Sequence, residues 1–258
     1  MDFPTKPHLP GNLTALFAQI KQHLREVSRF NLPVELDEKV NQIIDYYEDI
    51  GGSTLTTEQT LYRARSHNVD QRHPHPISEM GAPPPFVARA GRVNVTGMPF
   101  LYLADDIETC IAEIRPWTGA LVSVGKFQAS EPLSVLDFTK KRGLEDAENP
   151  ASALHSLLSE SDFVHKHFGA PVHIDDPYSY LPMQYLVDKV KARKFDGIRF
   201  KSMQKDKGIN TVVFNPANLA CVDVQVFGVK LVKYEAVALV RKPNSLNVGG
   251  YEIEAKDW

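Results

Sequence analysis

The chain has little cysteine, no long apolar run and almost balanced charge. Its two cysteines, Cys110 and Cys221, stand in apolar surroundings without a second Cys or His at metal-ligand spacing, which predicts buried, reduced thiols in a reducing cytoplasm. No apolar stretch approaches the ~20 residues of a membrane-spanning helix, and the first residues lack a basic and then apolar leader. A net charge of -3 creates no field that would attract nucleic acid or anionic lipid. We therefore expect no disulfide scaffold, no membrane anchoring and no nucleic-acid partner.

The composition that remains is that of a globular protein. Hydrophobic residues make up 43% of the chain and charged residues 24%. A chain of 258 residues is long enough to bury a sizeable core, either as one large domain or as a catalytic domain with a small extension.

Two helices are predicted between Asn12 and Gly51, because apolar residues recur there at helical spacing. Asn12 is a candidate N-cap, and the Gly pair at 51–52 is expected to end the second helix. This hairpin carries no concentrated polar group. We therefore divide the chain into a helical extension, residues 1–58, and a catalytic domain, residues 59–258.

After Thr60 the pattern changes to short β-like runs with a few helices between them, which predicts an α+β fold with a mixed sheet. No Gly-x-Gly-x-x-Gly motif follows a strand, which argues against a doubly wound dinucleotide-binding sheet. The expected helices are 105–115, 151–167 and 180–191. The expected strands are 61–66, 100–104, 121–127, 133–138, 195–200, 210–215, 220–227 and 234–240.

The stretch from 90 to 116 gathers groups that suit an anionic ligand. Arg92 follows Gly91, where the backbone can come close to a ligand, and its guanidinium can bind phosphate with two parallel hydrogen bonds. Alternation along its strand places Tyr102 opposite its leucine neighbours, so that its ring can face a cleft. Glu113 lies on a short helix with a buried apolar side, where a carboxylate needs a partner, and Arg92 and Arg115 are the candidates.

Arg63 and Arg65 lie two apart on a predicted strand, so both point to one face, and a same-side pair also suggests an anionic ligand. Each of these residues has an ordinary structural alternative. Arg92 can be a surface loop residue, Tyr102 a half-buried strand residue and Glu113 an exposed helix residue. Their occurrence together is what favours a site.

Four segments of the chain resemble the RES-domain family, named for an Arg, a Glu and a Ser. They are "LYRAR", "AGRVN..G.P.LYLA....T.IAEIRP", "QYLVDKVKARKFDGIRFKS" and "GINTVVFN", and the resemblance runs from about residue 61 to 226. The residues that match the family's motif are Arg63, Arg92, Tyr102, Glu113 and Ser202. The chain reads "AGRVN" where shorter members commonly have "GGRWN", and its N-terminal hairpin suggests a longer subgroup.

The resemblance implies an ADP-ribosyltransferase-like core that uses NAD as its substrate and no metal. Under it, Arg63 and Arg92 hold phosphate or ribose oxygens, and Tyr102 orients the nicotinamide ribose. Glu113 stabilises the cation that develops on the ribose, and Ser202 positions Glu113 or the nicotinamide. Ser202 can also simply end its strand.

Four further residues are candidates for substrate binding: Arg65, Gly91, Asn94 and Asn210. For both asparagines the default interpretation is a turn. The histidines His67, His73 and His75 are expected to be solvated loop residues without a role in catalysis.

The leading functional hypothesis is cleavage of the nicotinamide–ribose bond of NAD by a glycohydrolase or phosphorylase, in a cytoplasmic bacterial toxin that depletes NAD. A protein-modifying ADP-ribosyltransferase and a non-catalytic NAD or ADP-ribose sensor are the alternatives. A toxin would have an antitoxin protein as partner, and self-association into a homo-oligomer stays open.

Overall fold

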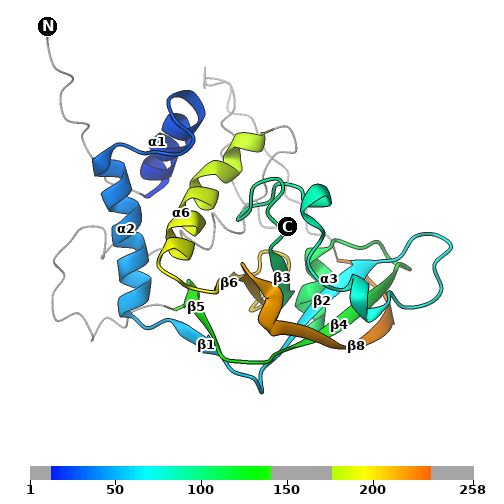
Figure 1. Cartoon of the computed structure of the whole chain (residues 1–258). Helices are drawn as coiled ribbons and strands as arrows, with labels where there is room; N and C mark the ends of the chain where they lie inside the picture. Colours follow the sequence, from blue (N-terminus) through cyan, green and yellow to red (C-terminus); the bar gives the residue numbers. More distant parts are fainter. Residues whose placement is uncertain (1–12, 141–175, 234–258) are drawn as a thin grey trace, which may run out of the picture.

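The computed structural model describes residues 13–140 and 176–233, and within these ranges the chain folds around a mixed eight-stranded sheet (Figure 1). The strand order is β1-β5-β6-β7-β3-β2-β4-β8, and β5 and β6 are parallel while the other neighbours are antiparallel. The strands are β1 (Ser53–Leu55), β2 (Thr60–Ser66), β3 (Leu101–Ala104), β4 (Leu121–Ala129), β5 (Leu133–Asp137), β6 (Gly197–Lys201), β7 (Ile209–Val213) and β8 (Leu219–Gly228). The predicted α+β class with a mixed sheet is confirmed.

The helices of the described residues agree with the predicted ones. They are α1 (Leu13–Glu26), α2 (Val34–Asp49), α3 (Ile107–Glu113) and α6 (Leu181–Ala192). Asp106 caps α3, since its side chain accepts a hydrogen bond of 2.8 Å from the backbone N–H of Thr109. Gly51, with φ of +89°, follows the end of α2, where the left-handed conformation favours glycine. The expected cap Asn12, helix 151–167 and strand 234–240 lie outside the described residues.

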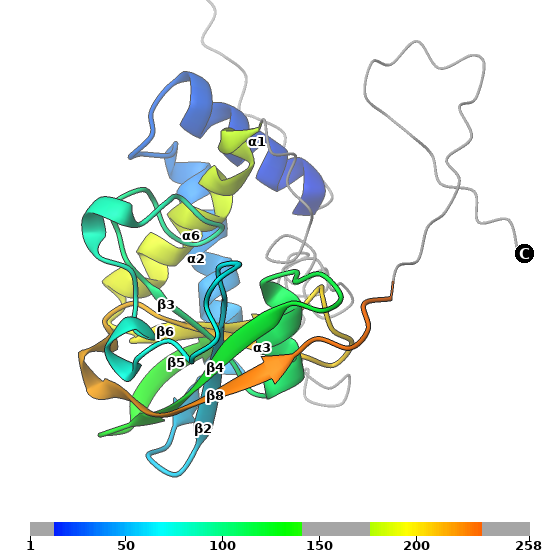
Figure 2. The ribbon, with the colours of Figure 1, turned by 90° about the vertical axis from the view of Figure 1, so that its right-hand side faces the viewer.

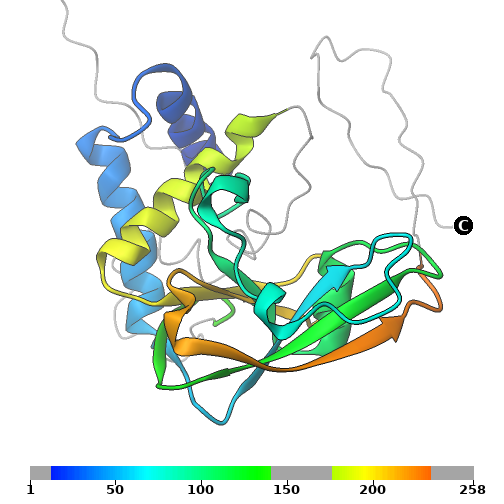
Figure 3. The same cartoon turned by 45° about the vertical axis from the view of Figure 1, so that its right-hand side comes forward.

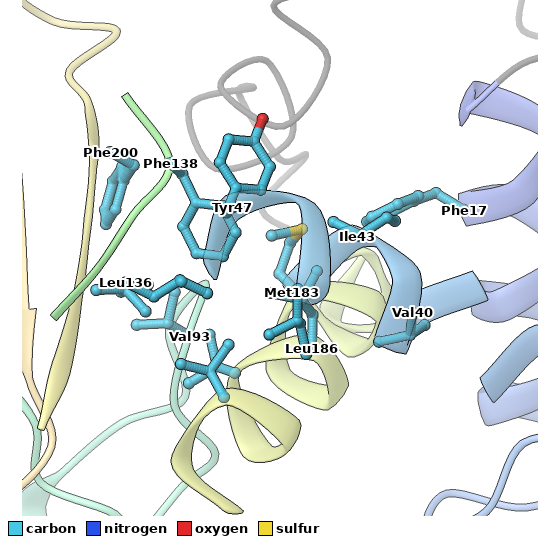
Figure 4. Packing of buried hydrophobic residues seen from close by; sticks show 14 of the residues in the cluster. Phe17, Val40, Ile43, Tyr47, Val93, Leu136, Phe138, Met183, Leu186 and Phe200 are labelled. Carbon is cyan, nitrogen blue, oxygen red and sulfur yellow. The ribbon is translucent and has the colours of Figure 1, made fainter. Parts of the chain in front are cut away.

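The N-terminal hairpin and α6 share one hydrophobic core with the β5–β6–β7 part of the sheet. Figure 4 shows Phe17 and Ile43 of the hairpin beside Met183 of α6, with Tyr47 near the strand residues. The rings of Tyr47 and Phe138 meet edge to face, 4.8 Å apart. The hairpin is therefore packed into the main core, and the proposed division between residues 58 and 59 stays a prediction.

Helix α3 packs beside β2, β3 and β4, away from the α1–α2–α6 group (Figures 2 and 3). The register Tyr102↔Val212 and Tyr62↔Ala104 shows that both helical layers cover the same face of the sheet. The opposite face is covered in part by the loop that carries two 3-10 turns, η1 (Ile77–Glu79) and η2 (Pro85–Val87). Met80 of this loop is completely buried in a second core cluster.

Candidate active site

A cavity of about 520 Å³ opens near the middle of the sheet, where β2 and β3 share only the pair Tyr62↔Ala104. Residues from β2, β3, α3 and β7 contribute to its wall. Among the described residues that line it, four are arginines and one is a carboxylate. They are Arg63, Arg89, Arg92, Arg115 and Glu113. Its volume is that of an ordinary small-molecule site, and its charge suits an anion.

Glu113 is exposed in this cavity and is held by two neutral donors. Its Oε1 accepts hydrogen bonds from the Ser202 hydroxyl at 2.6 Å and from the Asn210 side-chain amide at 2.7 Å. Glu113 itself is exposed, while Thr109 and Cys110 of α3 are buried and Ile107 and Ile111 pack against the same core cluster, which is the apolar side that the sequence predicted. The carboxylate is thus fixed on one oxygen while the residue lines the cavity.

Ser202 and Asn210 reach Glu113 from neighbouring parts of the sheet. Ser202 directly follows β6, and its hydroxyl oxygen also accepts the backbone N–H groups of Gln204 and Lys205, at 3.1 and 3.2 Å. It therefore ends the strand and holds Glu113 at the same time. The default turn role is wrong for Asn210, which is buried inside β7.

Tyr102 is fixed at its hydroxyl by Asn94. As predicted, its leucine neighbours are buried on the other face while Tyr102 lines the cavity. The hydroxyl donates to Asn94 Oδ1 at 2.6 Å, and its burial raises the pKa of Tyr102. The Asn94 amide in turn donates to the backbone carbonyls of Arg89, Val95 and Met98, so Asn94 orders the loop and orients Tyr102.

Gly91 lies against these two side chains. A Cβ at position 91 would stand 2.7 Å from Asn94 Oδ1 and 2.9 Å from the Tyr102 hydroxyl oxygen. The close approach that the glycine permits is thus to Asn94 and Tyr102. Gln184 of α6, which the sequence did not single out, donates to the carbonyls of Gly91 and Asn94 at 2.8 and 2.9 Å.

Arg63 and Arg65 share one face of β2 as predicted, and both bind the loop that follows. Arg63 donates to the carbonyls of Met80, at 3.1 Å, and Gly81, and Arg65 donates to that of Glu79. Arg63 also lines the cavity, whereas Arg65 lies outside its lining. The sequence suggested that the pair binds an anionic ligand. The structure shows that both side chains hold the loop, and that of the two only Arg63 also lines the cavity.

Desolvation weakens the proton affinity of two of the cavity's guanidinium groups. Burial, and then the charge of Arg65, lower the pKa of Arg63 to about 10. Burial also lowers the pKa of Arg92; the nearby charge of Glu113 opposes this shift and that of Arg115 adds to it. Both side chains remain cationic at neutral pH. An anion bound beside them would offset the cost of holding these charges away from water.

Several residues of the cavity wall were not predicted as site residues, and the polar ones include Arg89, Arg115 and Tyr180. Arg89 and Tyr180 were given no role, and Arg115 was considered only as a partner of Glu113. Arg115 has a positive φ of 47° and follows Ile114, the C-cap of α3. Arg89 directly precedes the motif segment that begins at Ala90, and Tyr180 comes from a loop far from it in the sequence, which only folding brings to the cavity.

Two of the three loop histidines are not solvated as expected. His67 is buried and meets the Ser123 hydroxyl at 2.7 Å, while His75 is mostly covered and meets Glu79 Oε2 at 3.2 Å. They anchor the loop that carries η1, because the His75 backbone N–H also donates to Ser123 at 2.9 Å. His73 is exposed.

Both cysteines are free, with Cys110 buried and Cys221 only partly so, which corrects the prediction for Cys221. Over residues 13–140 and 176–233, no three His, Cys, Asp or Glu side chains gather in a way that could hold a metal ion. In the same ranges, no helix has both the length and the apolar character needed to span a membrane.

Comparison with known proteins identifies a family. A search among curated proteins finds no match. Among solved structures, a chain from the crystal structure of the M. tuberculosis MbcT-MbcA toxin-antitoxin complex is 16% identical, with a TM-score of 0.39, over 74% of this chain and 93% of that chain. The model of the RES domain matches residues 60–234, which is well over half of the sequence. The chain therefore belongs to the RES domain family.

Proposed function

We propose that this protein cleaves the nicotinamide–ribose bond of NAD and transfers the ADP-ribose to water or phosphate. The observation that carries the proposal is the single cavity-lining carboxylate among the described residues, Glu113, which Ser202 and Asn210 hold among four arginines. Membership of the RES domain family, which is associated with NAD-processing enzymes, supports the same substrate.

The chemistry of this bond fits a site with one carboxylate. When the bond between ribose C1′ and the pyridinium nitrogen breaks, the electron pair goes to nicotinamide, which leaves as a neutral molecule and needs no proton. Positive charge then develops on the ribose. Glu113, one of whose oxygens is fixed by two donors, would stabilise that charge electrostatically. A two-carboxylate glycosidase mechanism would require a second acid in the cavity.

The arginines would provide substrate binding. A pyrophosphate carries two negative charges, and guanidinium groups bind phosphate with paired, charge-assisted hydrogen bonds. Arg92 and Arg63 are our candidates for this role, and Tyr102 is our candidate for orienting the ribose next to Glu113. Attack at C1′ then completes the transfer: water forms the C–O bond and releases a proton to solvent, whereas phosphate attacks through an anionic oxygen that has no proton to release.

In the cell, such a reaction would make the protein a toxin that acts in the cytoplasm by depleting NAD. A toxin of this kind requires a neutralising protein, for which the open, cationic cavity is a suitable target. We expect expression of the wild-type chain to arrest bacterial growth and lower cellular NAD.

The test is to incubate the purified protein with NAD, with and without phosphate, and to follow nicotinamide, ADP-ribose and phosphorylated ADP-ribose. Free ADP-ribose indicates hydrolysis, and a product that requires phosphate indicates phosphorolysis. Label transferred to added protein would indicate the protein-modifying alternative. Binding of NAD without release of nicotinamide would contradict the proposal and favour a sensor.

A further inference from the structure

Tyr180 belongs to the wall of the cavity but to none of the motif segments that point to the site. It is the last residue of the 3-10 turn η4 (Pro177–Tyr180) and directly precedes α6. The side chain is partly exposed and faces the same space as Tyr102 and Glu113. Its location thus depends on how η4 is held.

Helix α1 holds η4 through polar contacts. Lys21 Nζ lies 2.6 Å from Asp176 Oδ2 and 3.0 Å from the Ser179 hydroxyl. Asp176 also accepts the hydroxyl of Ser179 and the backbone N–H of Tyr178, so it caps the turn. One lysine of the N-terminal hairpin therefore binds both the cap of η4 and the residue before Tyr180.

Cation–π contacts add a second link between the turn and the hairpin, one from α1 and one from the loop that follows α1. The guanidinium carbons of Arg25 and Arg29 lie 5.4 and 5.8 Å from the centre of the Tyr178 ring. Both distances are within the range of cation–π interactions. The turn is thus fixed at Asp176, Tyr178 and Ser179, while Tyr180 is left to face the cavity.

The hydroxyl of Tyr180 lies close enough to the central residues of the site to affect them. The negative charge that this hydroxyl would carry as a phenolate raises the pKa of both Arg92 and Tyr102. A tyrosine ring in this place offers a flat apolar surface with only two side-chain torsions to order, which is typical of residues that contact planar ligands. NAD contains two planar ring systems, nicotinamide and adenine.

We propose that Tyr180 is a substrate-contacting residue that packs its ring against a planar ring of NAD, and that the N-terminal hairpin positions it through Lys21 and Arg25 of α1 and Arg29 of the loop that follows α1. The proposal rests on the proposed function for the identity of the ligand. It assigns the N-terminal hairpin a role in substrate binding that operates through η4, without a hairpin side chain in the cavity.

The first experiment compares Tyr180→Leu, Tyr180→Phe and Tyr180→Trp in the full chain. Because a stacked ring contacts the ground state and the transition state alike, Tyr180→Leu should raise KM by about 5- to 100-fold with little change in kcat. Phe and Trp should restore KM to within a few fold of wild type. The control is Tyr185→Leu, since Tyr185 lies on α6 outside the cavity lining and donates to Asp37.

The second experiment tests the positioning role with matched lysines. Lys21→Met removes the contact with η4, and Lys189→Met removes a similar half-buried contact between α6 and α2, Lys189 to Asp37. Lys21→Met should raise KM by about 3- to 10-fold, as the loss of one charged hydrogen bond allows. Lys189→Met should leave KM unchanged even if it lowers the unfolding temperature as much. In the Tyr180→Leu background, Lys21→Met should add little, because the two act through one residue.

The outcomes separate this inference from the proposed function. If Tyr180→Leu keeps the wild-type KM, or if Lys21→Met and Lys189→Met change KM equally, the inference is wrong even though NAD is cleaved. Calorimetric titration with NAD covers the case in which the protein does not cleave NAD. Binding that weakens in Tyr180→Leu without any release of nicotinamide would support the inference and contradict the proposed reaction, and no binding to the wild type would overturn both.

Discussion

Replacing Glu113 by Gln removes one negative charge from the cavity and almost nothing else. The two bonds at Oε1 come from donors, the Ser202 hydroxyl and the Asn210 amide, and a glutamine carbonyl oxygen can accept both. The new NH₂ group takes the position of the other oxygen. Since Glu113 is exposed in the cavity and outside the core, the fold should not be affected.

The size of the effect follows from the charge that forms on the ribose. Loss of one preorganised electrostatic contact with a developing charge typically reduces kcat by ~10²–10³, or about 2.7–4 kcal/mol. We expect this loss in kcat for Glu113→Gln, with a smaller change in NAD affinity because the arginines remain. Glu113→Ala should be at least as slow, since the hydrogen bonds from Ser202 and Asn210 are lost too.

The assay is the initial rate of nicotinamide release, with thermal unfolding measured on the same samples. Glu108→Gln is the control, because Glu108 is on the same helix, is largely exposed and pairs with Lys205 away from the cavity lining. It should keep its rate within about twofold, as is usual for exposed ion pairs. If folded Glu113→Gln retained a rate within about threefold of wild type, far short of the expected loss, Glu113 would not stabilise the transition state.

Three further predictions concern other parts of the site and its support. Arg92→Lys should weaken NAD binding by about tenfold or more, because an ammonium cannot form the paired contact of a guanidinium; an unchanged calorimetric Kd would place Arg92 outside the binding site. Gly91→Ala should reduce turnover by at least about tenfold, because its Cβ would displace Asn94 or Tyr102. Gly81→Ala, which has open space, is its control, and equal rates would contradict the steric argument. Hydrogen bonds from Lys21 and Ser179 lower the pKa of Asp176 from 3.8 to about 2, so the stabilisation is complete above about pH 4 and is lost as the pH falls towards 2. The difference in urea midpoint between wild type and Asp176→Asn should therefore shrink over that range, and a constant difference would refute the linkage.

The sequence alone determined the local elements with clear periodicity. Apolar residues at helical spacing located α1, α2 and α6, and alternation located most strands and placed Arg63 and Arg65 on one face. The two aspartates at 105–106 indicated from sequence where α3 begins, and the structure shows that Asp106 is the cap, since it accepts the backbone N–H of Thr109 three residues on. The three-residue strand β1 was missed, since it is too short to show a pattern. The motif residues could also be named from the sequence, because their spacing within 90–116 is local.

Only the tertiary structure decided what those residues contact. Arg92 and Arg115 were the candidate partners of Glu113, and the structure adds two donors, Ser202 and Asn210, from positions about ninety residues away in the chain. Arg89 and Tyr180 line the cavity although the sequence did not mark them as site residues. Arg65 was predicted to bind the substrate, but it donates to a loop carbonyl. The physical reason is that side-chain direction within an element follows from local periodicity. Which residue a side chain contacts depends on how segments that are far apart in the sequence pack together, and that packing exists only in the assembled core.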